Sequence, residues 1–136
     1  MENNKKNRPK IYNDTLRLVL LLEDIYDLYP KKYKYGWGAE MQKISRELFQ
    51  CVYASQTLTD FNQRAKQLEW YLVKFDTLYT LLEIINYKSA LPSNKINLIY
   101  RTMREIAPQI KGLRTYFATR ASESLAASNH SNNERK

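Results

Sequence analysis

Apolar residues recur every three or four positions along most of the chain, which is the spacing of one face of an α-helix. This pattern divides into four segments, residues 10–28, 36–55, 58–87 and 94–120. No segment shows the alternation of apolar and polar positions that a half-buried strand needs. Because the connections are only a few residues long, consecutive helices should lie antiparallel. We therefore predict an all-α protein, an up-and-down antiparallel four-helix bundle.

The stripe of the fourth helix is the most regular, because its spacings alternate between three and four residues over the whole segment. It consists of Ile96, Ile99, Met103, Ile106, Ile110, Leu113 and Phe117. Pro108 falls nearly opposite this stripe and should kink the helix away from the core. The chain has only 3 Gly and 4 Pro. Few, long elements are therefore expected.

Local signals predict where the helices begin and end. Tyr29-Pro30 should end the first helix, because the residue before a proline disfavours the helical conformation. Residues 31–35 are then a basic connection. Residues 57–60 are typical of a capping box at the start of the third helix, and Ser93 is the expected N-cap of the fourth.

The third helix carries a second apolar stripe beside its first. The additional residues are Tyr71, Leu78, Leu81 and Ile85. A helix that is apolar over a wide arc is buried on more than one side. This pattern favours either a subunit interface or a helix deep inside its own bundle, and the residues leave both open.

Positive charge is concentrated in parts of the chain. The formal net charge is +8 and the sequence pI is about 9.5. The excess is +3 in residues 1–10, +3 in residues 30–57 and +5 in residues 92–120. Such a surface favours polyanions through the release of condensed counterions.

The candidate nucleic-acid-binding residues lie on the second and fourth helices. At 100° per residue, Arg101, Arg104 and Lys111 fall within about 80° of one another, and Arg114 flanks them. Lys43 and Arg46 are neighbours on the second helix. A solvated polar face is the competing interpretation. The 11 tyrosines fit a subunit interface for the most part, although a tyrosine beside an arginine could also stack on a base.

Residues that carry catalysis or hold metals are sparse. The one cysteine, Cys51, occupies a core position of the second helix, and the one histidine, His130, lies in a polar segment. We expect no enzyme activity, no cofactor and no metal site. The longest apolar run, residues 18–22, is too short to span a membrane. A single cysteine cannot form a disulfide within the chain, which fits a reducing cytosol, so we expect a cytoplasmic protein. Residues 10–120 should form the bundle, between a disordered basic arm (1–9) and a disordered polar tail (121–136).

Several local sequences occur in an order that resembles a known family. They are Leu28-Tyr29-Pro30, Gly38 followed by Glu40-Met41, residues 84–88 (IINYK) and residues 106–113 (IAPQIKGL). They are similar to the accessory variability determinant proteins of diversity-generating retroelements, which are related to the S23-like four-helix-bundle proteins. Residues 112–117 read GLRTYF, where members tend to have a Gly-Gly-Trp-like sequence.

The resemblance implies a pentamer of bundles with a basic surface. That surface would contact a reverse transcriptase and its template RNA, and would support the synthesis of mutagenic cDNA without chemistry of its own. The alternative is an S23-like bundle with a structural or nucleic-acid-binding role (RNA or DNA) that is unrelated to a reverse transcriptase.

Overall fold

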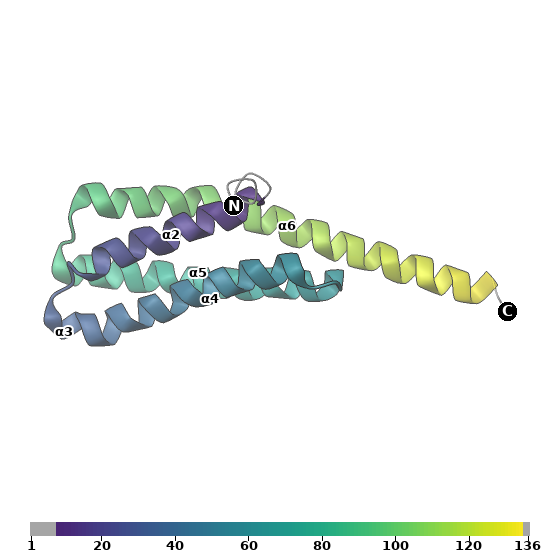
Figure 1. The fold of residues 1–136 in the computed structure, drawn as a ribbon, viewed down its shortest axis with the longest axis horizontal. Helices are drawn as coiled ribbons and strands as arrows, with labels where there is room; N and C mark the ends of the chain where they lie inside the picture. The colour runs from purple at the N-terminus through teal and green to yellow at the C-terminus, as the bar shows by residue number, and fades with distance from the viewer. Residues whose placement is uncertain (1–7, 135–136) are drawn as a thin grey trace.

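The protein is a four-helix bundle, as the sequence predicts (Figure 1). The computed structural model describes residues 8–134. Its elements are α2 (Lys10–Tyr26), a short turn α3 (Lys31–Tyr33), a π-helical segment η1 (Lys34–Gly38), α4 (Ala39–Thr57), α5 (Phe61–Ser89) and α6 (Ser93–Glu134). The predicted basic arm, residues 1–9, lies almost entirely outside the described part of the chain.

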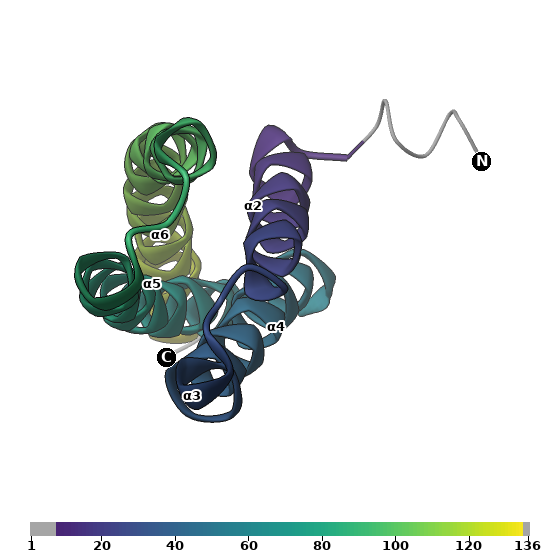
Figure 2. The ribbon, with the colours of Figure 1, turned by 90° about the vertical axis from the view of Figure 1, so that its left-hand side faces the viewer.

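Each long helix packs against two others. The packed pairs are α2 with α4, α4 with α5, α5 with α6, and α6 with α2. Seen along the bundle, the four helices therefore follow one another around a ring (Figure 2). Two pairs face each other across a diagonal, α2 with α5 and α4 with α6.

The core contains most of the apolar stripe predicted for the fourth helix, with Leu113 only half-buried, together with apolar residues of the other three helices. Leu18, Leu48, Leu68, Leu82 and Ile99, drawn from all four helices, are completely buried. Across one diagonal, the hydroxyl of Tyr71 on α5 lies 2.9 Å from Oγ1 of Thr15 on α2, with both side chains fully buried. Among the described residues, no buried side-chain nitrogen or oxygen lacks a hydrogen-bond partner.

The second apolar stripe of the third predicted helix lies inside the bundle. Tyr71, Leu78, Leu81 and Ile85 are all buried by helices of the same chain. This outcome agrees with the second of the two interpretations. The stripe itself is therefore no evidence for a subunit interface.

The connection predicted at residues 31–35 is helical instead. The chain forms α3 and then the π-helical segment η1, which runs directly into α4. Gly38, at the predicted start of the second helix, is buried against the rings of Tyr26 and Tyr29. Close packing of two aromatic side chains on a bare backbone thus outweighs the low helix propensity of glycine.

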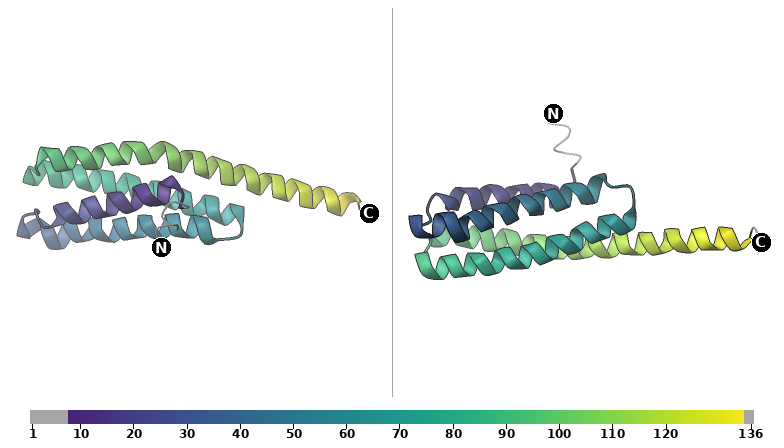
Figure 3. Two further views of the ribbon diagram at one scale, coloured as in Figure 1. Left: turned by 45° about the horizontal axis from the view of Figure 1, so that its top comes forward. Right: turned by 90° about the horizontal axis from the view of Figure 1, so that it is seen from below.

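Two other predicted helix ends are also wrong. α5 begins three residues after its predicted start, because Asp60 caps it by accepting a 3.1 Å hydrogen bond from the backbone N–H of Asn62. α6 does not end at Arg120 but continues to Glu134, and its last part projects beyond the bundle (Figure 3). Residues 113–134 contain no Gly or Pro, so nothing stops a helix that is already nucleated. The predicted disordered tail is thus helical over most of its length.

Pro108 lies within α6, on an exposed position as predicted. The helix continues through it and changes direction along its length (Figure 3). A proline in a helix removes one backbone hydrogen bond and crowds the preceding turn. Its exposed position keeps this disturbance away from the core.

Candidate nucleic-acid interface

The six predicted contact residues lie on two separate surfaces. Lys43 and Arg46, the α4 pair, project from α4. The other four, the α6 basic row, project from α6 and consist of Arg101, Arg104, Lys111 and Arg114. All six side chains are exposed. Because α4 and α6 face each other across the bundle (Figure 2), the two groups do not form one continuous patch.

None of the six cations forms an ion pair with a carboxylate in the described part of the chain. The ion pairs there use other cations, for example Lys10 with Asp14 at 2.8 Å and Lys95 with Asp24 at 2.7 Å. Lys34, Lys74 and Arg120 are paired as well. The predicted residues thus keep their positive charge available for an external anion.

Acidic residues on α5 run alongside the α6 basic row. Glu69, Asp76 and Glu83 are seven residues apart and so share one side of α5. Tyr79 lies on the same side of α5, three residues after Asp76 and four before Glu83. This side faces α6, because the Tyr79 ring contacts the ring of Tyr100 on α6, with centroids 5.3 Å apart. Glu83 is hydrogen-bonded to Tyr79 and raises the pKa of its hydroxyl. These carboxylates weaken the positive potential on the α5 side of the row, so its outward side is the more favourable one for a phosphate chain.

The beginning of α6 provides polar groups beside the basic row. Arg101 and Arg104 line a shallow hollow together with Asn94, Asn97 and Leu98. Guanidinium groups donate paired hydrogen bonds to phosphate, and amides can donate to phosphate or sugar oxygens. The part of the row formed by Arg101 and Arg104 therefore has the composition of a surface that binds the sugar-phosphate backbone of a nucleic acid.

Trp70 is an exposed aromatic residue that the sequence reasoning missed. It leaves 60% of its surface exposed on α5. A shallow hollow beside it is lined by Glu69, Val73 and Lys74, and the Lys74 ammonium lies 5.9 Å from the indole centroid. The available signal was its position outside both apolar stripes of the third helix, because a tryptophan off the core face must be exposed.

A cross-helix ion pair connects this region to α4. Lys74 donates a hydrogen bond to the carboxylate of Glu47, and this bond lowers the pKa of Glu47. The pair fixes how α4 and α5 are aligned along their axes. It also neutralises a carboxylate next to the α4 pair.

One end of the bundle is rich in exposed aromatic residues. Tyr35 and Tyr87 are 74% and 92% exposed, and Trp37 is 40% exposed. They belong to the same end, because the Lys88 ammonium lies 5.9 Å from the ring of Tyr33. Tyrosine and tryptophan are enriched in protein interfaces, so this end has the composition of a protein-binding surface.

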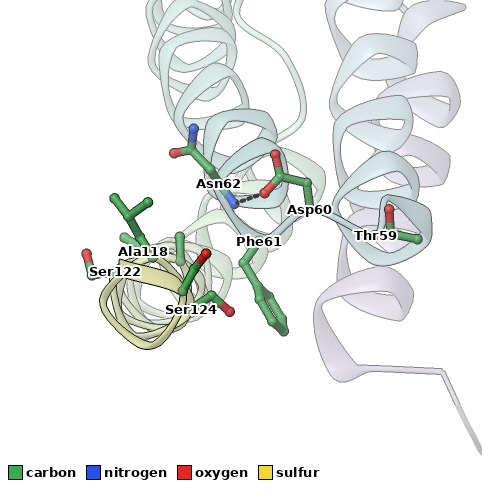
Figure 4. A pocket seen from close by; sticks show the side chains of 10 residues that line it. Thr59, Asp60, Phe61, Asn62, Ala118, Ser122 and Ser124 are labelled. Atoms are coloured by element: carbon green, nitrogen blue, oxygen red, sulfur yellow. Dashed lines mark hydrogen bonds between the residues drawn. The ribbon is translucent and has the colours of Figure 1, made fainter. Parts of the chain in front are cut away.

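The opposite end holds a hollow between the start of α5 and the projecting part of α6 (Figure 4). Thr59, Asp60, Phe61, Asn62, Ala118 and Ser122 contribute to its lining. The guanidinium of Arg64 lies 5.4 Å from the ring of Phe61, which lines the hollow, and 5.5 Å from the Phe117 ring. No cation lines the hollow itself, so the polyanion assignment does not extend to it.

The one cysteine, which could have been a reactive group, lies in the core. Cys51 is buried, and this burial raises the pKa of its thiol. A thiol in such a position is a small apolar core residue. Among the side chains that the structure describes, no three His, Cys, Asp or Glu gather in a way that could hold a metal ion. No helix in this part of the chain is long and apolar enough to cross a membrane.

Comparison with models of known protein families gives no match, and comparison with curated protein sequences gives none either.

Proposed function

We propose that this protein is a non-catalytic nucleic-acid-binding bundle that works as an accessory protein of a diversity-generating retroelement. The observation that supports nucleic-acid binding is that the six predicted cations are free to contact an anion. All six predicted cations are exposed, and none is paired with a carboxylate among the described residues. An array of free cations on rigid helices gains binding energy from each counterion that it releases.

The accessory role rests on the resemblance described above together with the four-helix fold that it implies. In this role the bundle holds template RNA on its basic surface and contacts a reverse transcriptase. The exposed aromatic end, with Tyr35, Trp37 and Tyr87, supports binding of a protein partner or of further copies of the chain. The resemblance implies that such a homo-oligomer is a pentamer. Sedimentation of the purified chain tests the oligomer directly.

The binding role is tested by removing two cations from the α6 basic row. Arg101→Ala with Arg104→Ala should weaken binding of single-stranded RNA and reduce the slope of log K against log salt by about 1.4, or about 0.7 for each lost phosphate contact. Both side chains are exposed, so the melting temperature should stay nearly unchanged. Lys10→Ala with Lys95→Ala is the matched control, because it removes the same charge from residues that are already in ion pairs. Equal slopes for the two double variants would contradict the assignment.

The polymerase partnership is tested by reconstitution. Reverse transcriptase and template RNA should produce full-length cDNA only when the bundle is added. Tyr35→Ala with Tyr87→Ala should reduce this stimulation while leaving RNA affinity unchanged, because neither residue belongs to the α4 pair or to the α6 basic row. If the bundle binds RNA but does not stimulate cDNA synthesis, the S23-like alternative would be favoured.

A further inference from the structure

The face shared by α4 and α5 combines an exposed indole with several cations. Trp70 stands one helical turn from Lys66 on one side and one turn from Lys74 on the other, and all three are on α5. Residues four apart are neighbours on a helix surface. The indole therefore lies between two lysines, of which Lys74 is in an ion pair with Glu47 and Lys66 forms none in the described part of the chain.

The ion pair between Glu47 and Lys74 places the α4 pair relative to Trp70. α4 and α5 run in opposite directions, so positions before Glu47 on α4 are level with positions after Lys74 on α5. With a rise of 1.5 Å per residue, Arg46 lies about 7.5 Å and Lys43 about 12 Å from Trp70 along the bundle axis. These distances fall within the span of a few nucleotides.

The carboxylates near the indole reduce this charge only in part. Glu47 is neutralised by Lys74, which leaves Glu69 beside the indole as the remaining acid in the hollow. Lys43, Arg46 and Lys66 form no ion pair within the described part of the chain and so remain available.

We propose that Trp70 stacks on an unpaired base of single-stranded nucleic acid whose phosphates lie along Lys66 and the α4 pair. Proteins that bind single strands combine a basic track with aromatic side chains that stack on bases. The hollow beside the indole, which Val73 lines with its aliphatic side chain, leaves one side of the ring accessible. This inference rests on the proposed nucleic-acid binding and adds a second contact surface that prefers single strands over duplexes.

A second copy of the chain is a poorer occupant of this face. Trp70 and Val73 are the apolar side chains that line the hollow, whereas a stable protein interface buries about 800 Å² on each partner. Two like-charged rows of cations would also face each other in a symmetric dimer. The charge and the small apolar area both favour a polyanion.

The chain offers a direct optical test, because Trp37 and Trp70 are its only tryptophans. In a Trp37→Phe background, a homopolymeric single-stranded RNA should quench the remaining emission, and a duplex RNA of the same length should not. Trp70→Ala should lower the affinity for the single strand by roughly ten-fold or more, as expected for one stacked base, and leave the duplex affinity unchanged. Trp70→Phe should recover part of the loss, and Leu20→Ala serves as the control, because Leu20 is an exposed apolar residue on α2, outside the hollow.

The outcomes separate this inference from the proposed function. RNA binding without any change in Trp70 emission, and with full affinity in Trp70→Ala, would overturn the stacking site and leave the proposed function standing. Emission that depends on protein concentration in the absence of RNA would assign the face to a second copy instead. Failure to bind either RNA would overturn both proposals. Circular dichroism melting of each variant establishes that the bundle is folded, which the exposure of Trp70 leads us to expect.

Discussion

Replacing Gly38 with alanine should destabilise the bundle, although alanine is the better helix former. A Cβ at this position would lie 2.8 Å from Cδ2 of Tyr29 and 3.2 Å from Cε2 of Tyr26. Carbon atoms in contact prefer about 3.5 to 4.0 Å. Tyr29 cannot move away easily, because its ring is buried and its hydroxyl donates a 3.5 Å hydrogen bond to Sδ of Met41.

The expected magnitude follows from two opposing effects. Gly→Ala inside a helix stabilises by about 0.5 to 1 kcal/mol through backbone entropy. Overpacking a close-packed core costs about 1 to 3 kcal/mol. The clash should win, and Gly38→Ala should lower the free energy of unfolding by about 1 kcal/mol. Gly112 is the internal control, since a Cβ there meets nothing within 4 Å. Gly112→Ala should therefore stabilise by the full entropic gain.

Urea unfolding followed by circular dichroism measures both variants under identical conditions. We expect opposite signs for the same substitution, with a difference of about 2 kcal/mol between the two proteins. A Gly38→Ala variant as stable as Gly112→Ala would refute the reasoning. It would mean that the rings of Tyr26 and Tyr29 do not pack on the backbone at this point.

Three further predictions concern the core and the end of α6. Tyr71→Phe removes the buried hydrogen bond to Thr15 and should lower the free energy of unfolding by about 1 kcal/mol; an unchanged urea midpoint would contradict it. Burial raises the pKa of Tyr29, so the folded state resists its ionisation. Stability should be intact below about pH 10, the ordinary tyrosine pKa, and fall at higher pH. Tyr29→Phe should reduce this alkaline loss, and an identical pH profile for both proteins would argue against it. Deleting residues 121–136 should lower the helical signal but leave the melting temperature nearly unchanged, because the described side chains there are exposed or half-buried; a large fall in melting temperature would show that this segment packs on the bundle.

Much of the fold could be predicted from the spacing of apolar residues. Ile99, Ile106 and Ile110 are completely buried, as the heptad in the fourth helix requires. Composition was the less reliable guide. It indicated a connection at residues 31–35 and disorder after Arg120, and both segments are helical. Residues 31–35 belong to α3 and η1, which run directly into α4. Residues 121–134 are helical because a helix without Gly or Pro continues once it has formed.

Part of the candidate site could likewise be predicted from the sequence, and part could not. Exposure of the six cations follows from their positions opposite the apolar stripes. Their separation into two surfaces follows from topology, since the second and fourth helices of an up-and-down bundle lie on a diagonal. The contact between Lys74 and Glu47, and with it the alignment of Trp70 relative to the α4 pair, depends on how far each helix is shifted along the bundle. The spacing of apolar residues along a helix does not predict how far that helix is shifted along the bundle.

The most direct test of the central claim is the salt dependence of RNA binding by the unmodified protein. Fluorescence anisotropy with a labelled single-stranded RNA gives the binding constant over a range of salt concentrations. The account predicts that log K falls linearly with log salt, with a slope of about −0.7 for each phosphate held and up to about −4 if all six cations take part. A slope near zero, or no binding at low salt, would contradict it.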